Sequence, residues 1–156
     1  METASISNIK KELKNIPGEQ LQEMLIRLAK YKKENKELLS YLLFEAYNEA
    51  EYIRQVKEEI DEQFSSLNRS SFYLAKKTLR KVLRTTNKHI RFSGNKETEI
   101  ELLLYFCTKM KASRLNYKQS KVVFNMYLNQ VKRIQKVIAM LHEDLQYDYR
   151  EELEKL

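Results

Sequence analysis

The stretch FYLAKKTLRKVLRTTNKHIR, residues 72–91, predicts the fold class of this chain most directly. Its apolar positions recur every three or four residues, and at about 100° per residue they fall within roughly 100° of arc on a helix. The members of this arc are Phe72, Ala75, Leu79, Val82, Leu83, Thr86 and Ile90. The stretch therefore predicts an amphipathic helix that is capped by Ser70 or Ser71 and ends near Ile90.

The opposite side of the same helix is predicted to carry a stripe of positive charge, which we call the basic face. It comprises Tyr73, Lys77, Arg80, Arg84, Lys88 and Arg91, and these residues also share an arc about 100° wide. Like charges at i, i+4 on a helix cost about 0.2–0.5 kcal/mol per pair. We therefore expect an anionic partner, or screening by salt, to offset the repulsion.

The charge pattern of the whole chain is centred on this helix. Residues 63–142 hold seventeen basic and three acidic side chains, whereas residues 1–62 hold ten basic and thirteen acidic ones. Residues 143–156 hold two basic and six acidic side chains. The formal net charge of +7 is thus a basic middle with acidic ends, which indicates anionic partners but says nothing about the fold.

Helical periodicity extends along most of the 156 residues, and only two Gly and one Pro interrupt it. Such scarcity of turn residues argues against sheets. We expect helices over about 6–15, 17–32, 38–46, 48–67, 70–90, 96–111 and 117–145, with a turn over residues 32–36. The sixth is apolar nearly all round at residues 102–107, so we expect it to be central.

The predicted fold class is therefore all-α, with a single domain over residues 1–156. It should contain about seven antiparallel helices, as a bundle or an array of helical hairpins, and the sequence leaves both open. Residues 1–4 and about 146–156 are expected to fray. No apolar run approaches 18 residues, so neither a membrane span nor a signal peptide is expected.

Residues able to carry catalysis or bind a metal are scarce. The two histidines, His89 and His142, are far apart in sequence, and neither lies in a zinc or di-iron ligand motif. Two glycines do not make a phosphate-binding loop. Cys107 lies in the apolar run 102–107 and is expected to be an inert, buried thiol. We expect no enzyme activity, metal, cofactor or small-molecule substrate.

Three partners could offset the charge of the basic face. It could pair with carboxylates of the helix over 48–67 or of the C-terminal tail, bind nucleic-acid phosphates with Tyr73 stacked on a base, or simply be screened by salt. Internal pairing is favoured because the acids are already on the chain. We therefore expect a non-enzymatic protein-interaction or scaffold module that can self-associate, with non-specific nucleic-acid binding through the basic face as the alternative.

The run RLAKYKKENKELLSYLLFEA, residues 27–46, together with AKKTLRK, residues 75–81, resembles small bacterial cytoplasmic proteins grouped as a family of unknown function. The resemblance spans most of residues 5–115. It implies an all-helical domain, a bacterial source and a cytoplasmic location. It supplies no activity and no site residue.

Overall fold

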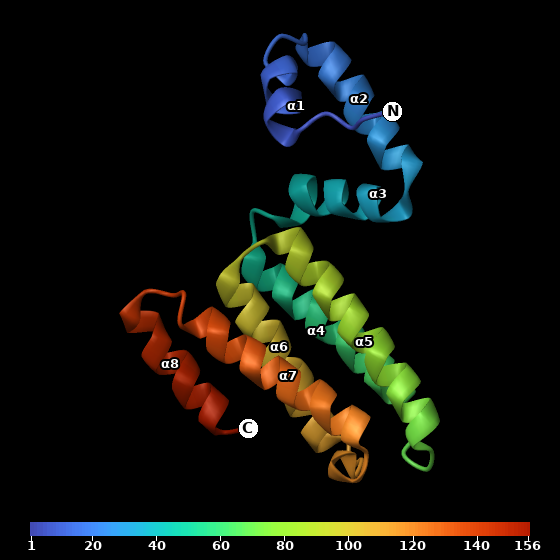
Figure 1. Cartoon of the computed structure of the whole chain (residues 1–156), viewed down its shortest axis with the longest axis vertical. Coiled ribbons are helices and arrows are strands. Elements are labelled where there is room, and N and C mark those ends of the chain that lie inside the picture. Colours follow the sequence, from blue (N-terminus) through green and yellow to red (C-terminus); the bar gives the residue numbers. More distant parts are fainter. The chain divides into compact units, whose positions relative to one another are not determined.

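The computed structural model describes all 156 residues and contains helices but no strands, so the chain is all-α (Figure 1). It has eight α-helices, one short π-helix and one short 3₁₀-helix. The bounds are α1 Ile6–Leu13, α2 Gly18–Tyr31, α3 Lys33–Ser40, η1 Tyr41–Glu45, α4 Glu49–Ser65, α5 Phe72–Ser93, α6 Lys96–Ala112, η2 Tyr117–Gln119, α7 Lys121–Ile138 and α8 Glu143–Glu154.

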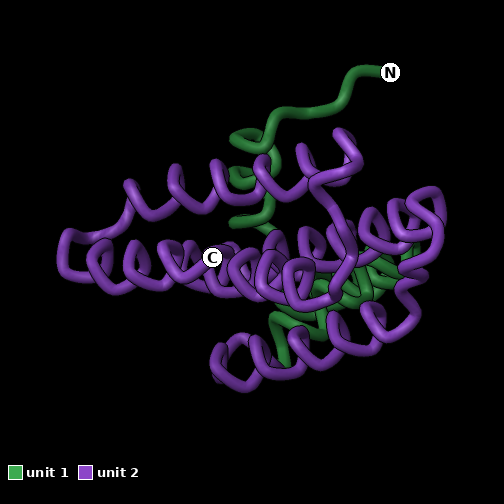
Figure 2. The backbone as a smooth tube through the Cα atoms, turned by 90° about the horizontal axis from the view of Figure 1, so that it is seen from below, with its two compact units in different colours: residues 1–44 green, residues 45–156 purple.

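The chain divides into two compact units, residues 1–44 and 45–156, which we call unit 1 and unit 2 (Figure 2). Unit 1 contains α1, α2 and α3, and unit 2 contains α4 to α8. The sequence predicts a single domain over the whole chain, and this stays a prediction. None of the helices is long and apolar enough to cross a membrane.

Helices α1 and α2 begin within one residue of their predicted starts, whereas α3 begins five residues before its predicted start at 38, and none of the three contains a buried side chain. Ser5 caps α1 by accepting a hydrogen bond from the Asn8 backbone N–H, and Pro17 directly precedes α2. The turn expected over residues 32–36 is wrong, because only Lys32 leaves the helical conformation and α3 begins at Lys33. The Asn35 side-chain amide stabilises this bend by donating to the Leu28 carbonyl oxygen at 2.8 Å.

Unit 2 is built around α6, as the run at 102–107 predicts. Helix α6 packs mainly against α4, α5 and α7, and eight of its side chains are buried. Leu103 and Phe106 have no exposed surface, and Phe106 lies 5.8 Å from Phe64 of α4 between ring centroids. A helix surrounded by other helices buries apolar residues on every side, which explains the absence of a polar face.

The ends of the helices in unit 2 follow local sequence signals. Asn48 caps α4 by accepting the Glu51 N–H, and Ser71 caps α5 by accepting the Leu74 N–H. Gly94 ends α5 with φ of 65°, a left-handed conformation that suits a residue without Cβ, and Asn95 caps α6. The predicted starts of α4, α5 and α6 are therefore confirmed to within two residues, whereas α5 extends to Ser93, beyond its predicted end near Ile90.

The C-terminal end differs from the prediction of one long helix with a frayed tail. Helix α7 ends at Ile138, and α8 begins after His142, whose backbone is extended. Helix α8 packs on α7, and its Tyr149 hydroxyl donates to Glu97 of α6 at 3.1 Å; the expected fraying of residues 146–156 stays a prediction. Contacts with α6 and α7 therefore position α8, although the sequence of α8 is strongly acidic.

Candidate functional site

The basic face lies along α5, as its spacing predicts. Ala75, Leu79, Val82, Thr86 and Ile90 are buried on the inner side of this helix. Because side chains at i, i+3 and i+4 share one side of a helix, this anchoring leaves the opposite side turned to solvent. Lys77, Arg80, Arg84, Arg91 and Tyr73 are exposed there, and Lys88 is half-buried. What the basic face binds stays a prediction.

Four cations of the basic face have no acidic partner. Lys77, Arg80, Arg84 and Arg91 form no ion pair and no side-chain hydrogen bond, although eight other ion pairs occur in the chain. The favoured hypothesis of internal pairing therefore does not hold for these four side chains. Salt or an external anion is left to balance their charge.

Two carboxylates of α4, Glu59 and Asp61, bind partners other than the exposed cations of the basic face. Glu59 accepts from, or ion-pairs with, the His89 ring at 2.9 Å, and Asp61 binds Lys109 at 2.7 Å. The Tyr105 hydroxyl also donates to both oxygens of Asp61, each at 2.8 Å. Each of these acids thus satisfies a partner other than the exposed cations of α5.

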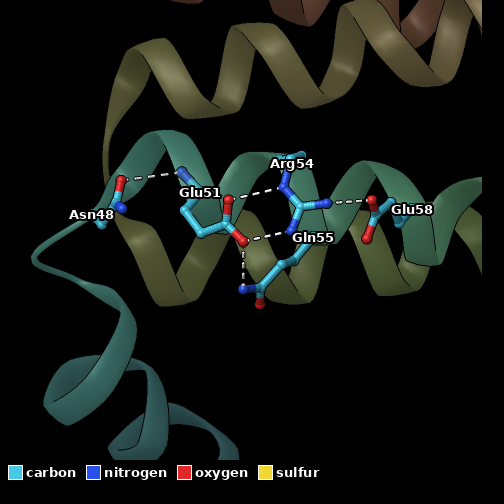
Figure 3. A network of polar contacts seen from close by, with 5 residues as sticks. All are labelled: Asn48, Glu51, Arg54, Gln55 and Glu58. Carbon is cyan, nitrogen blue, oxygen red and sulfur yellow. Dashed lines mark hydrogen bonds and ion pairs between the residues drawn. The ribbon is translucent and has the colours of Figure 1, made fainter.

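A second set of α4 carboxylates is neutralised within α4 itself (Figure 3). Arg54 donates to Glu51 through Nε at 2.8 Å and Nη2 at 2.5 Å, and to Glu58 through Nη1. Gln55 adds a hydrogen bond to Glu51 at 3.1 Å. The hydrogen bonds from Arg54 and then Gln55 lower the pKa of Glu51 to about 2, because they favour its charged form.

Polar contacts through His89 and Asn87 hold α5 in place. The Tyr52 hydroxyl lies 2.7 Å from His89 Nδ1, so His89 bridges Tyr52 and Glu59 of α4. Arg133 of α7 donates to Asn87 of α5 at 2.5 Å and to Glu99 of α6 at 2.6 Å. These contacts fix the helix that presents the cations, and they would keep the basic face rigid when an anion binds.

The strongest departure from the sequence prediction lies in unit 1. Leu21, Met24, Leu25 and Leu28 form an apolar stripe at helical spacing on α2, yet α1, α2 and α3 contain no buried side chain. Leu28 is 57% exposed and Leu25 is 47% exposed. Further apolar side chains are exposed at both ends of the unit, at Ile6, Leu42, Leu43 and Phe44. Sequence periodicity indicates such a stripe but not whether anything covers it.

The structure also contains a cavity that the sequence does not predict. Its volume is about 480 Å³, and it lies between α4, α6 and α8. Four carboxylates (Glu97, Glu101, Asp148, Glu152) line it, together with Lys57, Tyr105 and Tyr149. Lys57 pairs with Glu101 at 3.3 Å, and burial followed by the hydrogen bond to Glu97 raises the pKa of Tyr149. The spacing 145, 148, 149 and 152 on α8 could have indicated that these side chains share one side.

No three His, Cys, Asp or Glu side chains are placed to hold a metal ion. Cys107 is buried, and burial raises its pKa to about 12, so the thiol stays protonated and weakly nucleophilic.

Comparison of the chain with protein-family models, curated proteins and solved structures finds no match. The resemblance to small bacterial helical proteins therefore gains no support from these comparisons. A function has to be argued from the surfaces of the molecule itself.

Proposed function

We propose that this chain is a non-enzymatic helical protein-interaction module that acts through unit 1. The observation that supports this is the absence of any buried side chain on α1, α2 and α3, although each has an apolar side. Contiguous exposed apolar surface is uncommon on monomeric proteins and marks sites of association. Covering it is favourable by about 25 cal/mol per Å² of apolar surface removed from water.

A second copy of the chain is the partner that the proposal puts first. Identical amphipathic helices have matching apolar stripes, and a twofold arrangement brings the same patch of each copy together. A cytoplasmic location, a bacterial source and the absence of a small-molecule substrate belong to the same proposal. So does an antiparallel helical bundle in unit 2, which the packing of α6 against three other helices favours.

Sedimentation of the full chain tests self-association. We expect the average mass to rise from low micromolar to hundreds of micromolar concentration, and the variant Leu25→Glu/Leu28→Glu to stay monomeric. The variant Gln20→Glu/Gln22→Glu is the matched control, because it adds the same two charges to α2 outside the apolar stripe. A wild-type chain that is monomeric throughout, and that retains no protein partner from a cell extract, would contradict the proposal.

Non-specific nucleic-acid binding is the second candidate function. The observation that favours it is the set of four exposed cations on α5 that have no carboxylate partner. Phosphates that replace salt counterions at such cations make binding steeply salt-dependent. Binding should therefore be measured between 50 and 200 mM salt with Arg80→Glu/Arg84→Glu, and undetectable binding at the low-salt limit would exclude this function.

A further inference from the structure

We infer that the basic face binds single-stranded nucleic acid, with Tyr73 stacked on an unpaired base and the cations following one phosphate backbone. This inference rests on the second candidate function and names its ligand. Three features of α5 support it: the row of cations, the exposed ring of Tyr73, which makes no hydrogen bond or ring contact within the protein, and the apolar side chains of the N-terminal turn.

The cations of α5 form a single line. Lys77, Arg80, Arg84 and Arg91 lie within fourteen residues, a length of about 21 Å at 1.5 Å per residue. Including the half-buried Lys88, successive members are three or four residues apart, which is about 4.5–6 Å along the axis. One row of charges on one straight helix matches one backbone, and proteins that bind single strands use positively charged tracks of this kind.

Tyr73 lies at the N-terminal end of this line and has no role within the protein. It is 72% exposed, and it makes no hydrogen bond, ring contact or cation–π contact. An exposed aromatic side chain is costly to leave in water, whereas stacking a base on it is favourable for any base. Tyr31 is similarly exposed, but Lys32 already lies over its ring at 5.9 Å, whereas Tyr73 lies at one end of a row of cations and makes no such contact.

Tyr147 provides the contrast. It is 71% exposed, so it offers nearly the same ring surface as Tyr73. However, it lies on α8 among Glu143, Asp144, Asp148 and Glu151, and these carboxylates would repel a phosphate backbone. A base could reach either ring, but Tyr73 adjoins a row of cations, whereas Tyr147 has a single cation, Arg150, among several carboxylates.

The N-terminal turn of α5 argues against a duplex as the preferred ligand. Helices that read duplex DNA place hydrogen-bonding side chains of their N-terminal turns against base edges. The corresponding residues here are Phe72, Tyr73 and Leu74, which have exposed apolar surface. Stacking on Tyr73 requires a base that is not paired and enclosed in a duplex. Arg69, exposed just before the helix, extends the positive charge past Tyr73.

The test compares a labelled single strand of about twelve nucleotides with the matching duplex, by fluorescence anisotropy on the full chain. Loss of one stacked base lowers affinity by roughly 5- to 150-fold. We therefore expect Tyr73→Ala to weaken single-strand binding within that range and to leave duplex binding unchanged. Tyr73→Phe should retain the wild-type affinity, and so should Tyr147→Ala, the matched control. Circular dichroism would show that each variant is folded.

Salt dependence gives a second readout. Four phosphate contacts on a single strand reduce affinity by roughly 50-fold between 50 and 200 mM salt, from a slope of about −0.7 per contact. Removing two contacts with Arg80→Glu/Arg84→Glu should flatten the slope of log K against log salt by about 1.4. Lys10→Glu/Lys14→Glu on α1 makes the same charge change away from the basic face and should keep the wild-type slope.

The outcomes separate the inference from the function on which it rests. The single-strand inference would be overturned, and nucleic-acid binding kept, by one combination of results. In it, single strand and duplex bind with equal affinity, Tyr73→Ala has no effect, and Arg80→Glu/Arg84→Glu lowers the affinity for both. No binding to either oligonucleotide at 50 mM salt would overturn both. Binding to anionic phosphatidylserine vesicles with no binding to oligonucleotides would also overturn both and assign the cations to a lipid surface.

Discussion

Leucine truncation at one buried and one exposed position tests whether unit 1 lacks a core. Leu103 of α6 has no exposed surface, and Leu28 of α2 is 57% exposed. Leu103→Ala should lower the free energy of unfolding by about 2–5 kcal/mol, because it removes transfer free energy and leaves a cavity. Leu28→Ala opens no cavity and loses only part of a side chain that is mostly solvated, so it should cost less than about 1 kcal/mol.

Urea denaturation followed by far-ultraviolet circular dichroism measures both variants, at low micromolar protein. Against a typical total of about 5–15 kcal/mol, the Leu103→Ala loss should shift the midpoint clearly. Hydrogen exchange should also show low protection across α1 to α3 and high protection in α6, since local stability follows buried contacts.

The absence of a core in unit 1 is refuted if, at low protein concentration, Leu28→Ala lowers the free energy of unfolding as much as Leu103→Ala does. That would mean that the α2 stripe is covered within a single chain. A cost that is small at low concentration and grows with protein concentration would instead support cover by a second copy, since association adds its free energy to the folded state.

Three further predictions concern Gly94, Cys107 and Glu51, all of which lie in unit 2. Gly94→Ala should lower the free energy of unfolding, measured by urea denaturation, by about 1–2 kcal/mol because φ at Gly94 is 65°. An added Cβ would meet no atom within 4 Å at either glycine, so Gly18→Ala, where φ is not positive, should be neutral or stabilising. Equal effects of the two substitutions would contradict the role of the positive φ. Cys107, with its pKa of about 12, should resist iodoacetamide in the folded protein and react in urea, and rapid labelling of the native chain would show that the thiol is accessible. Because the pKa of Glu51 is depressed, its stabilising ion pair with Arg54 is complete above pH 4.5, the ordinary pKa, and is lost as the pH falls through about 2. The small difference in urea midpoint between wild type and Glu51→Gln should therefore vanish as the pH falls through that window. A difference that persists at the acid end would contradict the stabilising role of the Glu51 carboxylate.

Helix boundaries were predictable where one side chain or one backbone angle decides them. Asn48, Ser71 and Asn95 cap helices through hydrogen bonds to residues at most three positions away, so the signal is local. The short extent of the break at Lys32, expected as a turn over residues 32–36, and the separation of α7 from α8 were not predicted. Lys32 has no special turn chemistry, and the apolar stripe runs on through Leu141 and Leu145, so only tertiary packing distinguishes a continuous helix from a folded-back one.

The basic face was predictable as a set of residues but not in its state of pairing. Spacing alone places Tyr73, Lys77, Arg80, Arg84, Lys88 and Arg91 on one side of α5. Whether a carboxylate reaches them depends on which sides of α4 and α5 meet. That arrangement directs Asp61 to Lys109 and Glu59 to His89, and it leaves the exposed cations to solvent.

The amino-acid sequence by itself determined that the chain is all-helical, that α6 is apolar on every side and that positive charge is concentrated in one stripe. These properties depend on periodicity and composition, which act over a few residues. Only the tertiary structure decided that the stripe is unpaired, that α8 is held in place and that the apolar sides of unit 1 are uncovered. Burial and ion pairing depend on residues far apart in the chain, so no local pattern encodes them.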